Sequence, residues 1–392
     1  MIVTGGLYRE RCISPEWNHL YGSGGRAAAA LAGHAPSVEL ISYCEPSFVE
    51  RATLLMGLSG VGLITLPSRK TIDFHYFHPL SQPDMYWTGD IEPLIEVKGE
   101  IVLRFGMLEG GARVSADIAV FDPQSSNQAF RANGSTAGRL ATILNAQELR
   151  AMAPGLDRAM AARQVLAGSD DDILVVKRGP HGAAVYNSTG LLGQVPAYRS
   201  ERVFKIGSGD VFSAAFALYW AVEGRDPVEA ADLASRAVAH YVACRALPLP
   251  PVAGLVHGEA LPQMSSAGQI YLAAPFFSLG ERWVVEEART ALLSLGCKVF
   301  SPLHEVGSGP PDLVAPRDLV GLDTCTAVLA ILNGGDPGTL FEVGHARQRG
   351  IPVVGLAENV RQHDLTMPLG TGCEIVDDFA TAIYRAAWAA MR

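Results

Sequence analysis

The 392-residue sequence has little charge and no segment that would serve as a membrane anchor. Charged residues make up 18% of the chain, and 31 lysines and arginines stand against 40 acidic residues, so the formal net charge is −9. An acidic chain without a basic run is a poor ligand for nucleic acid, although small phosphorylated ligands need only local donors. Because it lacks any apolar run of about 18 residues and a signal peptide's positive start, we expect a cytoplasmic protein without membrane or nucleic-acid partners.

Cysteine is also scarce. The six cysteines form no C-x-x-C pair, so the sequence predicts neither a zinc site nor a disulfide framework, and buried free thiols are the expectation. Hydrophobic residues, in contrast, make up 48% of the chain, which excludes a disordered chain and predicts a sizeable core. At about 100–200 residues per domain, the length predicts two or three domains.

One segment has the composition of a linker. Residues 247–268 read LPLPPVAGLVHGEALPQMSSAG, which includes four prolines, three glycines and two serines. We therefore predict an N-terminal domain at 1–247, a linker at 248–267 and a C-terminal domain at 268–392.

Both domains are predicted to be α/β. In the C-terminal part, strand-like and helical segments alternate, which predicts a flavodoxin/Rossmann-like parallel sheet with its ligands at the carboxyl ends of the strands. The expected strands are Gln269–Ala273, Lys298–Ser301, Ala327–Leu332 and Pro352–Leu356, and the expected helices are Trp283–Leu295, Leu340–Arg349 and Asp378–Met391. The N-terminal part is less regular, with expected strands at 101–103, 118–121 and 173–176 and expected helices at 24–32, 211–222 and 227–243.

The N-terminal part contains a glycine turn, Ile206-Gly207-Ser208-Gly209-Asp210, directly before an apolar helix. Two glycines allow a tight turn that presents backbone N–H groups at a helix N-terminus, where anions bind. Asp210 could there accept a proton from an attacking hydroxyl while the amides stabilise phosphoryl charge. A plain turn with Asp210 as a helix cap is the alternative.

Residues 1–247 resemble the ribokinase/PfkB family of sugar and nucleoside kinases. The family's motifs have counterparts in the same order: Gly24-Gly25 before an alanine-rich helix, Asp122-Pro123 after a strand, an Asn-x-x-Glu pair, VKRGPHGA at 176–183 and the glycine turn. The resemblance implies a ribokinase-like fold, ATP and Mg²⁺ as cofactors, and Asp210 as the catalytic base. It also implies an anion hole and ATP site at Gly207, Ser208, Gly209, Gly179 and Gly182, a phosphate- and magnesium-linked pair at Asn145 and Glu148, and substrate-binding residues at Gly24, Gly25 and Glu10.

The chain departs from this family just before the glycine turn. Where the family usually has Asp-Thr-Thr, this sequence has Phe204-Lys205-Ile206, and Ala29 stands where the family has a substrate-side asparagine. This departure supports an alternative in which the domain senses nucleotides without turnover.

The C-terminal part carries four residues suited to glycosidic chemistry, namely Tyr271, Asp318, Asp336 and Glu342. In a parallel sheet they can converge at the carboxyl edge. From spacing alone, Thr339 could instead be a helix N-cap, with Glu342 closing a capping box. We expect no tightly bound metal in the protein, since His304 and His345 are not spaced as metal ligands would be.

These residues lie within motifs that resemble the nucleoside 2-deoxyribosyltransferase family, which includes nucleoside 5′-monophosphate N-glycosidases. The motifs are YLAAP from Tyr271, Ser301-Pro302, Arg317-Asp318-Leu319, DPGT from Asp336 and EVGHA from Glu342. The resemblance implies that Glu342 is the nucleophile at the anomeric carbon and that Tyr271 orients it. Asp318 and Asp336 would hold the base, with Asp318 as its proton donor, and no cofactor is needed. Ser278 and Arg282 either contact a 5′-phosphate or are merely polar surface residues.

Together, these patterns predict a bifunctional enzyme acting on small nucleosides or nucleotides, and the resemblance implies a homo-oligomer. The N-terminal domain would phosphorylate a nucleoside or pentose, and the C-terminal domain would cleave an N-glycosidic bond or transfer its sugar. The alternative is a glycosidase gated by a non-catalytic, nucleotide-sensing kinase-like domain.

Overall fold

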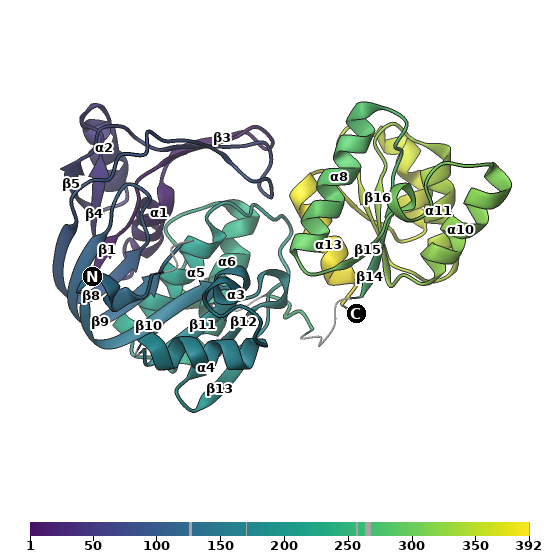
Figure 1. Ribbon diagram of the computed structural model, residues 1–392. Helices are drawn as coiled ribbons and strands as arrows, with labels where there is room; N and C mark the ends of the chain where they lie inside the picture. Colours follow the sequence, from purple (N-terminus) through teal and green to yellow (C-terminus); the bar gives the residue numbers. More distant parts are fainter. Residues whose placement is uncertain (125–127, 170, 256–257, 263–267, 392) are drawn as a thin grey trace. The chain divides into compact units, whose positions relative to one another are not determined.

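The computed structural model describes residues 1–124, 128–169, 171–255, 258–262 and 268–391 (Figure 1). The chain divides into two compact units, Met1–Leu261 and Pro262–Arg392. The expected linker at 248–267 falls in part on residues 256–257 and 263–267, which lie outside the described residues. Its described part includes one short helix, α7 (Val252–Leu255).

The first unit is built on a nine-stranded sheet with the order β13-β12-β11-β10-β9-β8-β1-β4-β5. The strands from β11 to β5 are parallel, and β12 and β13 are antiparallel additions at one edge. The strands are β1 (Ile2–Thr4), β4 (Glu39–Cys44), β5 (Gly62–Pro67), β8 (Ile95–Phe105), β9 (Ala112–Asp122), β10 (Thr136–Asn145), β11 (Ile173–Lys177), β12 (Ala183–Asn187) and β13 (Gly190–Val195). The three predicted strands are confirmed as parts of β8, β9 and β11, whereas the other six strands of this sheet were not predicted.

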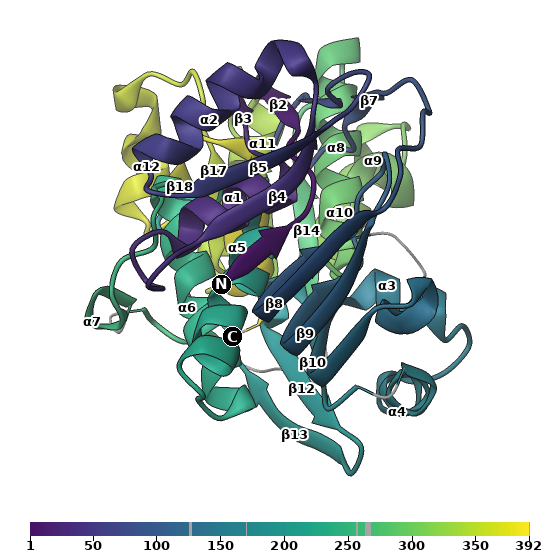
Figure 2. The ribbon, with the colours of Figure 1, turned by 90° about the vertical axis from the view of Figure 1, so that its left-hand side faces the viewer.

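Two groups of helices pack against this sheet (Figure 2). The first group shares a hydrophobic cluster with β1, β4 and β8 and comprises α1 (Gly22–Leu31), α2 (Val49–Leu58), α5 (Ser208–Phe216), the π-helical segment η4 (Ala217–Val222) and α6 (Pro227–Cys244). The second comprises α3 (Ala146–Met152) and α4 (Arg158–Ser169), which pack with β10, β11 and β12. Buried alanines let α1 approach the sheet closely, which brings the start of this helix to the carboxyl end of β1.

A separate four-stranded sheet has the order β3-β2-β6-β7. Its strands are β2 (Arg9–Cys12), β3 (Trp17–Leu20), β6 (Asp73–Tyr76) and β7 (Asp84–Tyr86). None of these short strands was predicted. Glu10 comes from β2, so this sheet supplies one of the predicted site residues.

The second unit has a five-stranded, entirely parallel sheet with the order β15-β14-β16-β17-β18. The parallel arrangement was predicted, but the strand order was not, and β18 was not among the four expected strands. The strands are β14 (Gln269–Ala273), β15 (Lys298–Phe300), β16 (Ala327–Ile331), β17 (Val353–Leu356) and β18 (Glu374–Val376). Figure 1 shows α8 (Leu279–Ser294) and α13 (Phe379–Ala389) on one side of this sheet and α10 (Pro311–Asp323) and α11 (Pro337–Gln348) on the other. Helix α8 begins four residues before the predicted start because Ser278 and Glu281 form a capping box.

The remaining helical elements are short. They are α9 (Pro302–Glu305), α12 (Thr366–Gly370) and the 3₁₀ turns η1 (Pro46–Phe48), η2 (Phe130–Asn133), η3 (Gly179–His181) and η5 (Gln362–Leu365).

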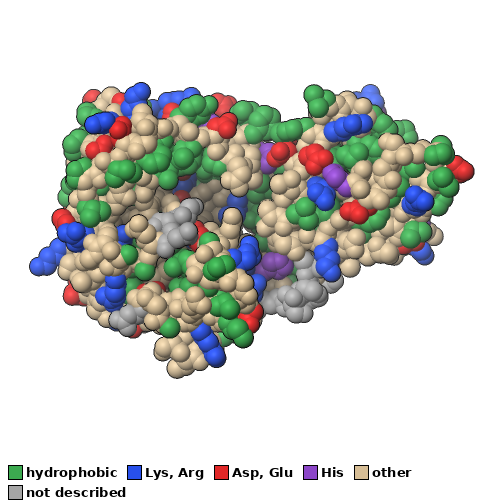
Figure 3. Space-filling model, viewed as in Figure 1, with side chains coloured by type: hydrophobic (Ala, Val, Ile, Leu, Met, Phe, Trp, Pro, Cys, Tyr) green, Lys and Arg blue, Asp and Glu red, His purple; other side chains and the backbone are tan. Residues whose placement is uncertain are grey.

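The cysteines are reduced, and most of them are buried. All six cysteines are free, and five are buried, but Cys244 is exposed, contrary to the expectation of buried thiols. On the face shown in Figure 3, lysines and arginines lie scattered among acidic side chains. Within the described ranges, none of the helices combines the length and apolarity that a membrane crossing requires.

Candidate active sites

The glycine turn has the conformation that its sequence predicts. Gly207 is the N-cap of α5, with a φ of 75°, and Asp210 lies in the first turn of this helix. This positive φ favours glycine. A Cβ at position 207 would also overlap the Arg26 guanidinium, so the turn and this arginine pack directly together.

Arg26, which the sequence analysis did not single out, is buried at the centre of this site. Its Nη1 donates to Asp210 Oδ2 at 2.8 Å and to Glu10 Oε1 at 3.0 Å, and its Nη2 binds the other Glu10 oxygen. Its Nε donates to the Tyr241 hydroxyl at 3.0 Å. Gln124 Nε2 donates to Asp210 Oδ1 at 2.7 Å, so both carboxylate oxygens of Asp210 have partners.

The charges around Asp210 act in opposite directions. Burial raises the pKa of Asp210, Arg26 opposes this increase, and the nearby Glu10 and Asp122 carboxylates add to it. A carboxylate with a raised pKa holds a proton more tightly and is therefore a stronger base.

Two lysines lie beside the first residues of α5. Lys177 Nζ binds Asp122 Oδ2 at 2.6 Å, and a Cβ on Gly209 would lie 3.5 Å from this nitrogen. Lys205 Nζ donates to Ser208 Oγ at 2.8 Å. Burial and the neighbouring Lys177 lower the pKa of Lys205 to about 8, although Asp210 opposes the shift.

The other predicted residues of this site cap a helix, form a turn or allow close packing of a helix. Asn145 and Glu148 form the capping box of α3, although Glu148 also raises the pKa of Lys177 and so lies within its electrostatic reach. Gly179 and Gly182 lie at the two ends of the turn that follows β11. A Cβ on Gly182 would overlap the backbone carbonyl oxygen of Val195. The remaining two, Gly24 and Gly25, lie where α1 packs closely against the segment after β1.

The second candidate site brings four predicted residues together. Tyr271, buried in β14, donates its hydroxyl to Glu342 Oε1 on α11 at 2.5 Å. Burial raises the pKa of Glu342 to about 7, the Tyr271 hydrogen bond opposes this increase, and the Asp318 and Asp336 charges add to it. Stacking on Phe300, with ring centroids 5.5 Å apart, holds the Tyr271 ring in place.

The start of α11 corrects one sequence-based alternative. Asp336 is the N-cap of α11, because its Oδ2 accepts hydrogen bonds from Thr339 N at 2.6 Å and from Thr339 Oγ1 at 2.8 Å. The capping box of Thr339 and Glu342 is therefore wrong, since α11 begins at Pro337. Glu342 lies farther along this helix, and its carboxylate binds Tyr271 instead.

Asp318 on α10 has an unusual carboxyl group. Within the described structure its Oδ1 is buried without a hydrogen-bond partner, and burial raises the pKa of the group. A carboxyl in this setting holds a proton more tightly than an exposed one, which suits a general acid. By contrast, Ser278 caps α8, and Arg282 Nε donates to Phe276 O at 2.9 Å, so a phosphate contact by this pair stays a prediction.

Sequence reasoning missed five residues of the cluster around Asp210. Arg26 and Gln124 bind Asp210 itself, Tyr241 binds Arg26, and Lys177 and Ser213 bind the neighbouring Asp122. Arg26 gave one detectable signal, because a single charge within an alanine-rich helix must find a buried partner.

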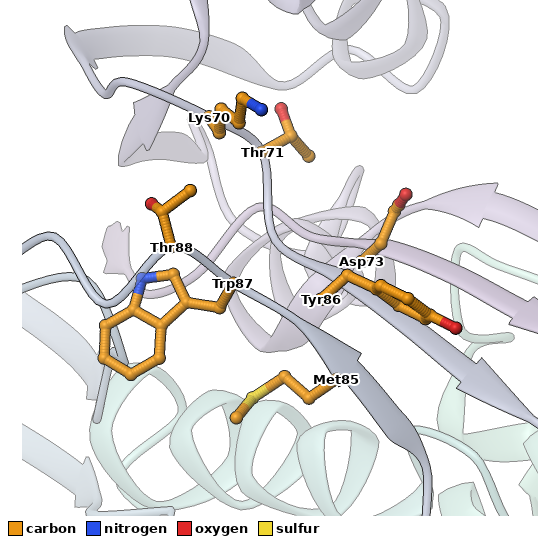
Figure 4. Close-up of a pocket in the computed structure, with 7 residues that line it drawn as sticks. All are labelled: Lys70, Thr71, Asp73, Met85, Tyr86, Trp87 and Thr88. Atoms are coloured by element: carbon orange, nitrogen blue, oxygen red, sulfur yellow. The ribbon is translucent and has the colours of Figure 1, made fainter.

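A cavity of about 390 Å³ lies beside the small sheet, and its lining includes no predicted site residue (Figure 4). Its lining comprises Lys70, Thr71, Asp73, Met85, Tyr86, Trp87 and Thr88. The Asp73 carboxylate already lies 3.6 Å from Arg11 Nη2, so the acid in this cavity has a partner.

Comparisons with known proteins agree with the two sets of motifs. Residues 113–247 match the family model of the pfkB family carbohydrate kinases, and residues 270–382 match that of nucleoside 2-deoxyribosyltransferase. Both are families of enzymes, and the chain carries their segments in the predicted order. Curated protein sequences give no match.

Similar solved structures come from kinases. A mutant of phosphofructokinase-2 from Escherichia coli is 18% identical, with a TM-score of 0.48 over 63% of this chain and 95% of that one. A ribokinase from Thermotoga maritima is 17% identical, with a TM-score of 0.45 over 65% of this chain and 97% of that one.

Proposed function

We propose that this chain is a bifunctional enzyme of nucleoside metabolism. Its domain at 1–247 phosphorylates a nucleoside or pentose with ATP, and its domain at 268–392 cleaves the N-glycosidic bond of a nucleoside or nucleoside 5′-monophosphate, by hydrolysis or by deoxyribosyl transfer. The observation that carries the proposal is the hydrogen bond of 2.5 Å from Tyr271 to Glu342, inside the segment that matches the deoxyribosyltransferase family.

In the C-terminal domain, the ionised Glu342 carboxylate attacks the anomeric carbon. The bond from this carbon to the base nitrogen breaks, the electron pair goes to the base, and Asp318 gives the base a proton. Tyr271 orients Glu342 and stabilises its charge, while Asp336 helps to hold the base. Water or a second base then attacks the anomeric carbon of the glycosyl ester, its proton returns to the ionised Asp318, and the Glu342 carboxylate is released.

In the N-terminal domain, Asp210 takes the proton of the substrate hydroxyl, whose oxygen bonds to the transferred phosphorus. The amides of the turn, together with Gly179 and Gly182, bind the charge of the phosphates, and Glu10, Gly24 and Gly25 lie on the substrate side. The oxygen between the transferred and the remaining phosphates keeps the electron pair of the broken bond.

The side chains near Lys177 fit a Mg²⁺ ion that arrives with the nucleotide. Glu148, on the α3 cap with Asn145, supplies the kind of oxygen ligand that Mg²⁺ prefers. Within the described ranges, however, no group of three or more histidine, cysteine or acidic side chains could hold a metal by itself. When bound, Mg²⁺ neutralises phosphate charge.

One observation favours the alternative of a gated glycosidase. Arg26 and Gln124 engage both oxygens of Asp210, so a substrate hydroxyl would have to share an oxygen with one of these donors. A domain that binds a nucleotide without turnover would keep these contacts.

A chromatographic assay separates the two functions. Purified protein is incubated with nucleosides and their 5′-monophosphates, with and without Mg-ATP, and free base and new phosphate esters are followed. Base release from monophosphates without ATP, and from nucleosides only with ATP, supports phosphorylation followed by cleavage. Base release without any new ester supports the gated glycosidase, and no base release from any substrate rejects both.

A further inference from the structure

The segment before the glycine turn places a second lysine at the start of α5, where the proposed mechanism does not use it. Lys205 Nζ lies 2.8 Å from Ser208 Oγ, and Lys177 Nζ lies close to the Cβ position of Gly209. Ser208 and Gly209 are the first two residues of α5. Both ammonium groups therefore flank the same stretch of backbone.

The two lysines differ in how their charge is balanced. Lys177 forms an ion pair with Asp122. Lys205 forms no ion pair with any carboxylate in the described part of the chain, and the closest acid by its electrostatic effect, Asp210, is already bound by Arg26 and Gln124. Burial is the main cause of the lowered pKa of Lys205, and the positive charge of Lys177 adds to it, so a bound anion would stabilise the Lys205 ammonium.

We propose that Lys205 and Lys177 together bind the diphosphate portion of the phosphoryl donor at this turn. The ligand chemistry is a linear polyphosphate, supplied either by a nucleoside triphosphate or by inorganic pyrophosphate. A lysine ammonium suits this task because it is a compact charge with three donors on a flexible chain. The inference rests on the proposed kinase function and deepens it.

Phosphoryl transfer builds up negative charge that the two lysines can stabilise. As the bond to the transferred phosphorus breaks, its electron pair remains on the leaving phosphate, which gains negative charge. The substrate oxygen forms the new bond to phosphorus, and its proton goes to Asp210. The two ammonium groups stabilise the leaving phosphate without changing their own protonation.

The test is isothermal titration of the full chain with Mg-ADP, AMP and pyrophosphate as separate ligands. Lys205→Met removes the charge and keeps the length, Lys205→Arg keeps the charge, and Lys98→Met at an exposed lysine of β8 is the matched control. We expect Lys205→Met to weaken ADP or pyrophosphate binding at least about tenfold and AMP binding less than about twofold. The ligand that shows the larger loss identifies the donor class.

Two results overturn the proposal. Unchanged ADP and pyrophosphate binding by Lys205→Met excludes a phosphate contact, and an equal loss for AMP and ADP assigns Lys205 a structural role. If the wild-type chain binds none of the three ligands, the kinase function fails as well, whereas tight wild-type binding that Lys205→Met retains rejects this inference alone.

A pH series keeps the test decisive if Lys205→Met does not fold. Between pH 7 and 9 the Lys205 ammonium loses its proton, whereas the neighbouring Lys177, whose pKa is raised, keeps its charge. Wild-type affinity for the polyphosphate should fall severalfold over this range, and the affinity of Lys205→Arg should not. Equal pH dependence of the two proteins contradicts the proposal.

Discussion

At the scale of single residues, the setting of Glu342 predicts how glycosidic cleavage depends on pH. Its pKa of about 7 means that the ionised nucleophile forms only near neutral pH, so base release should rise through pH 7. The Tyr271 hydrogen bond favours the ionised form, whereas Asp318 and Asp336 oppose it. Tyr271→Phe should therefore shift the rise to higher pH and lower the rate at pH 7 roughly tenfold.

The control for this prediction is Tyr384→Phe, at a buried tyrosine of α13 that is not among the groups that shift the pKa of Glu342. Its pH profile of base release should match that of the wild type. A Tyr271→Phe profile with a lower rate but the same midpoint would mean that Tyr271 only packs against its neighbours.

The same carboxyl group also links stability to pH. Because the pKa of Glu342 is raised from 4.5 to about 7 in the folded state, the unfolded chain ionises first as the pH rises between these values. The free energy of unfolding should therefore fall across this window. Glu342→Gln removes this contribution, so it should be more stable than the wild type by about 1–2 kcal/mol at pH 8 and nearly equal at pH 4.

Urea denaturation at the two pH values, followed through the fluorescence of Trp283 and Trp388 in the second unit, measures this difference. Equal stability differences at pH 4 and pH 8 would contradict a raised pKa of Glu342.

At the scale of elements, the turn that opens α5 depends on a glycine for two reasons. Gly207 has a positive φ, and its missing side chain leaves room for Arg26. Gly207→Ala should cost roughly 2–3 kcal/mol of stability and abolish phosphoryl transfer. Gly224→Ala is the matched control, because Gly224 has a φ of 69° with open space around it, and it should cost only about 1 kcal/mol. Thermal unfolding and nucleotide titration check both variants, and equal costs would show that contact with Arg26 is unimportant.

Helix α11 provides a test of the Asp336 cap. Asp336→Ala removes the acceptor for Thr339 N and should cost about 1 kcal/mol of stability. Asp336→Asn retains an acceptor oxygen, so stability should change little, whereas base release should fall if this carboxylate also holds the base. Urea denaturation and the base-release assay distinguish these effects, and full activity of the asparagine variant would leave Asp336 with the cap alone.

The same helix shows how far local sequence patterns lead. Its existence and its place after β16 were predictable from the apolar pattern. The grouping of carboxylates around Glu342 was predictable from their positions near the ends of the strands. Its start was not, because Asp336 followed by proline and Thr339 followed by Glu342 are both valid N-terminal signals. Only tertiary contacts decide between them, since the Glu342 carboxylate binds Tyr271, which is 71 positions away in sequence.

At the scale of the whole molecule, the regular parallel sheet was predictable and the small sheet was not. The three central strands of the five-stranded sheet, β14, β16 and β17, are largely apolar and buried, which local patterns detect, whereas the edge strand β18 was not expected. Those of the small sheet are three or four residues long and mixed in polarity. Similarly, the ion pairs of Arg26 with Glu10 and Asp210 join residues 16 and 184 positions apart, a pairing that local sequence patterns do not encode.

The assignment of two chemistries to two units predicts that they can be abolished separately. Asp210 and Glu342 lie in different compact units, each with its own sheet and hydrophobic cluster. Asp210→Asn should lose phosphoryl transfer at least about a hundredfold and keep base release from a monophosphate, because the C-terminal carboxylates are unchanged. Glu342→Ala should show the reverse pattern.

Both variants are assayed as full chains, with base release and phosphate-ester formation measured in the same reaction. If cleavage requires the monophosphate, a nucleoside given with Mg-ATP is the decisive substrate, because base release then needs both sites in succession. Asp210→Asn should then release no base, Glu342→Ala should accumulate the monophosphate, and an equal mixture of the two variants should restore base release. Restoration requires the monophosphate to leave one chain and reach another, so its failure would mean that the intermediate passes between sites without release.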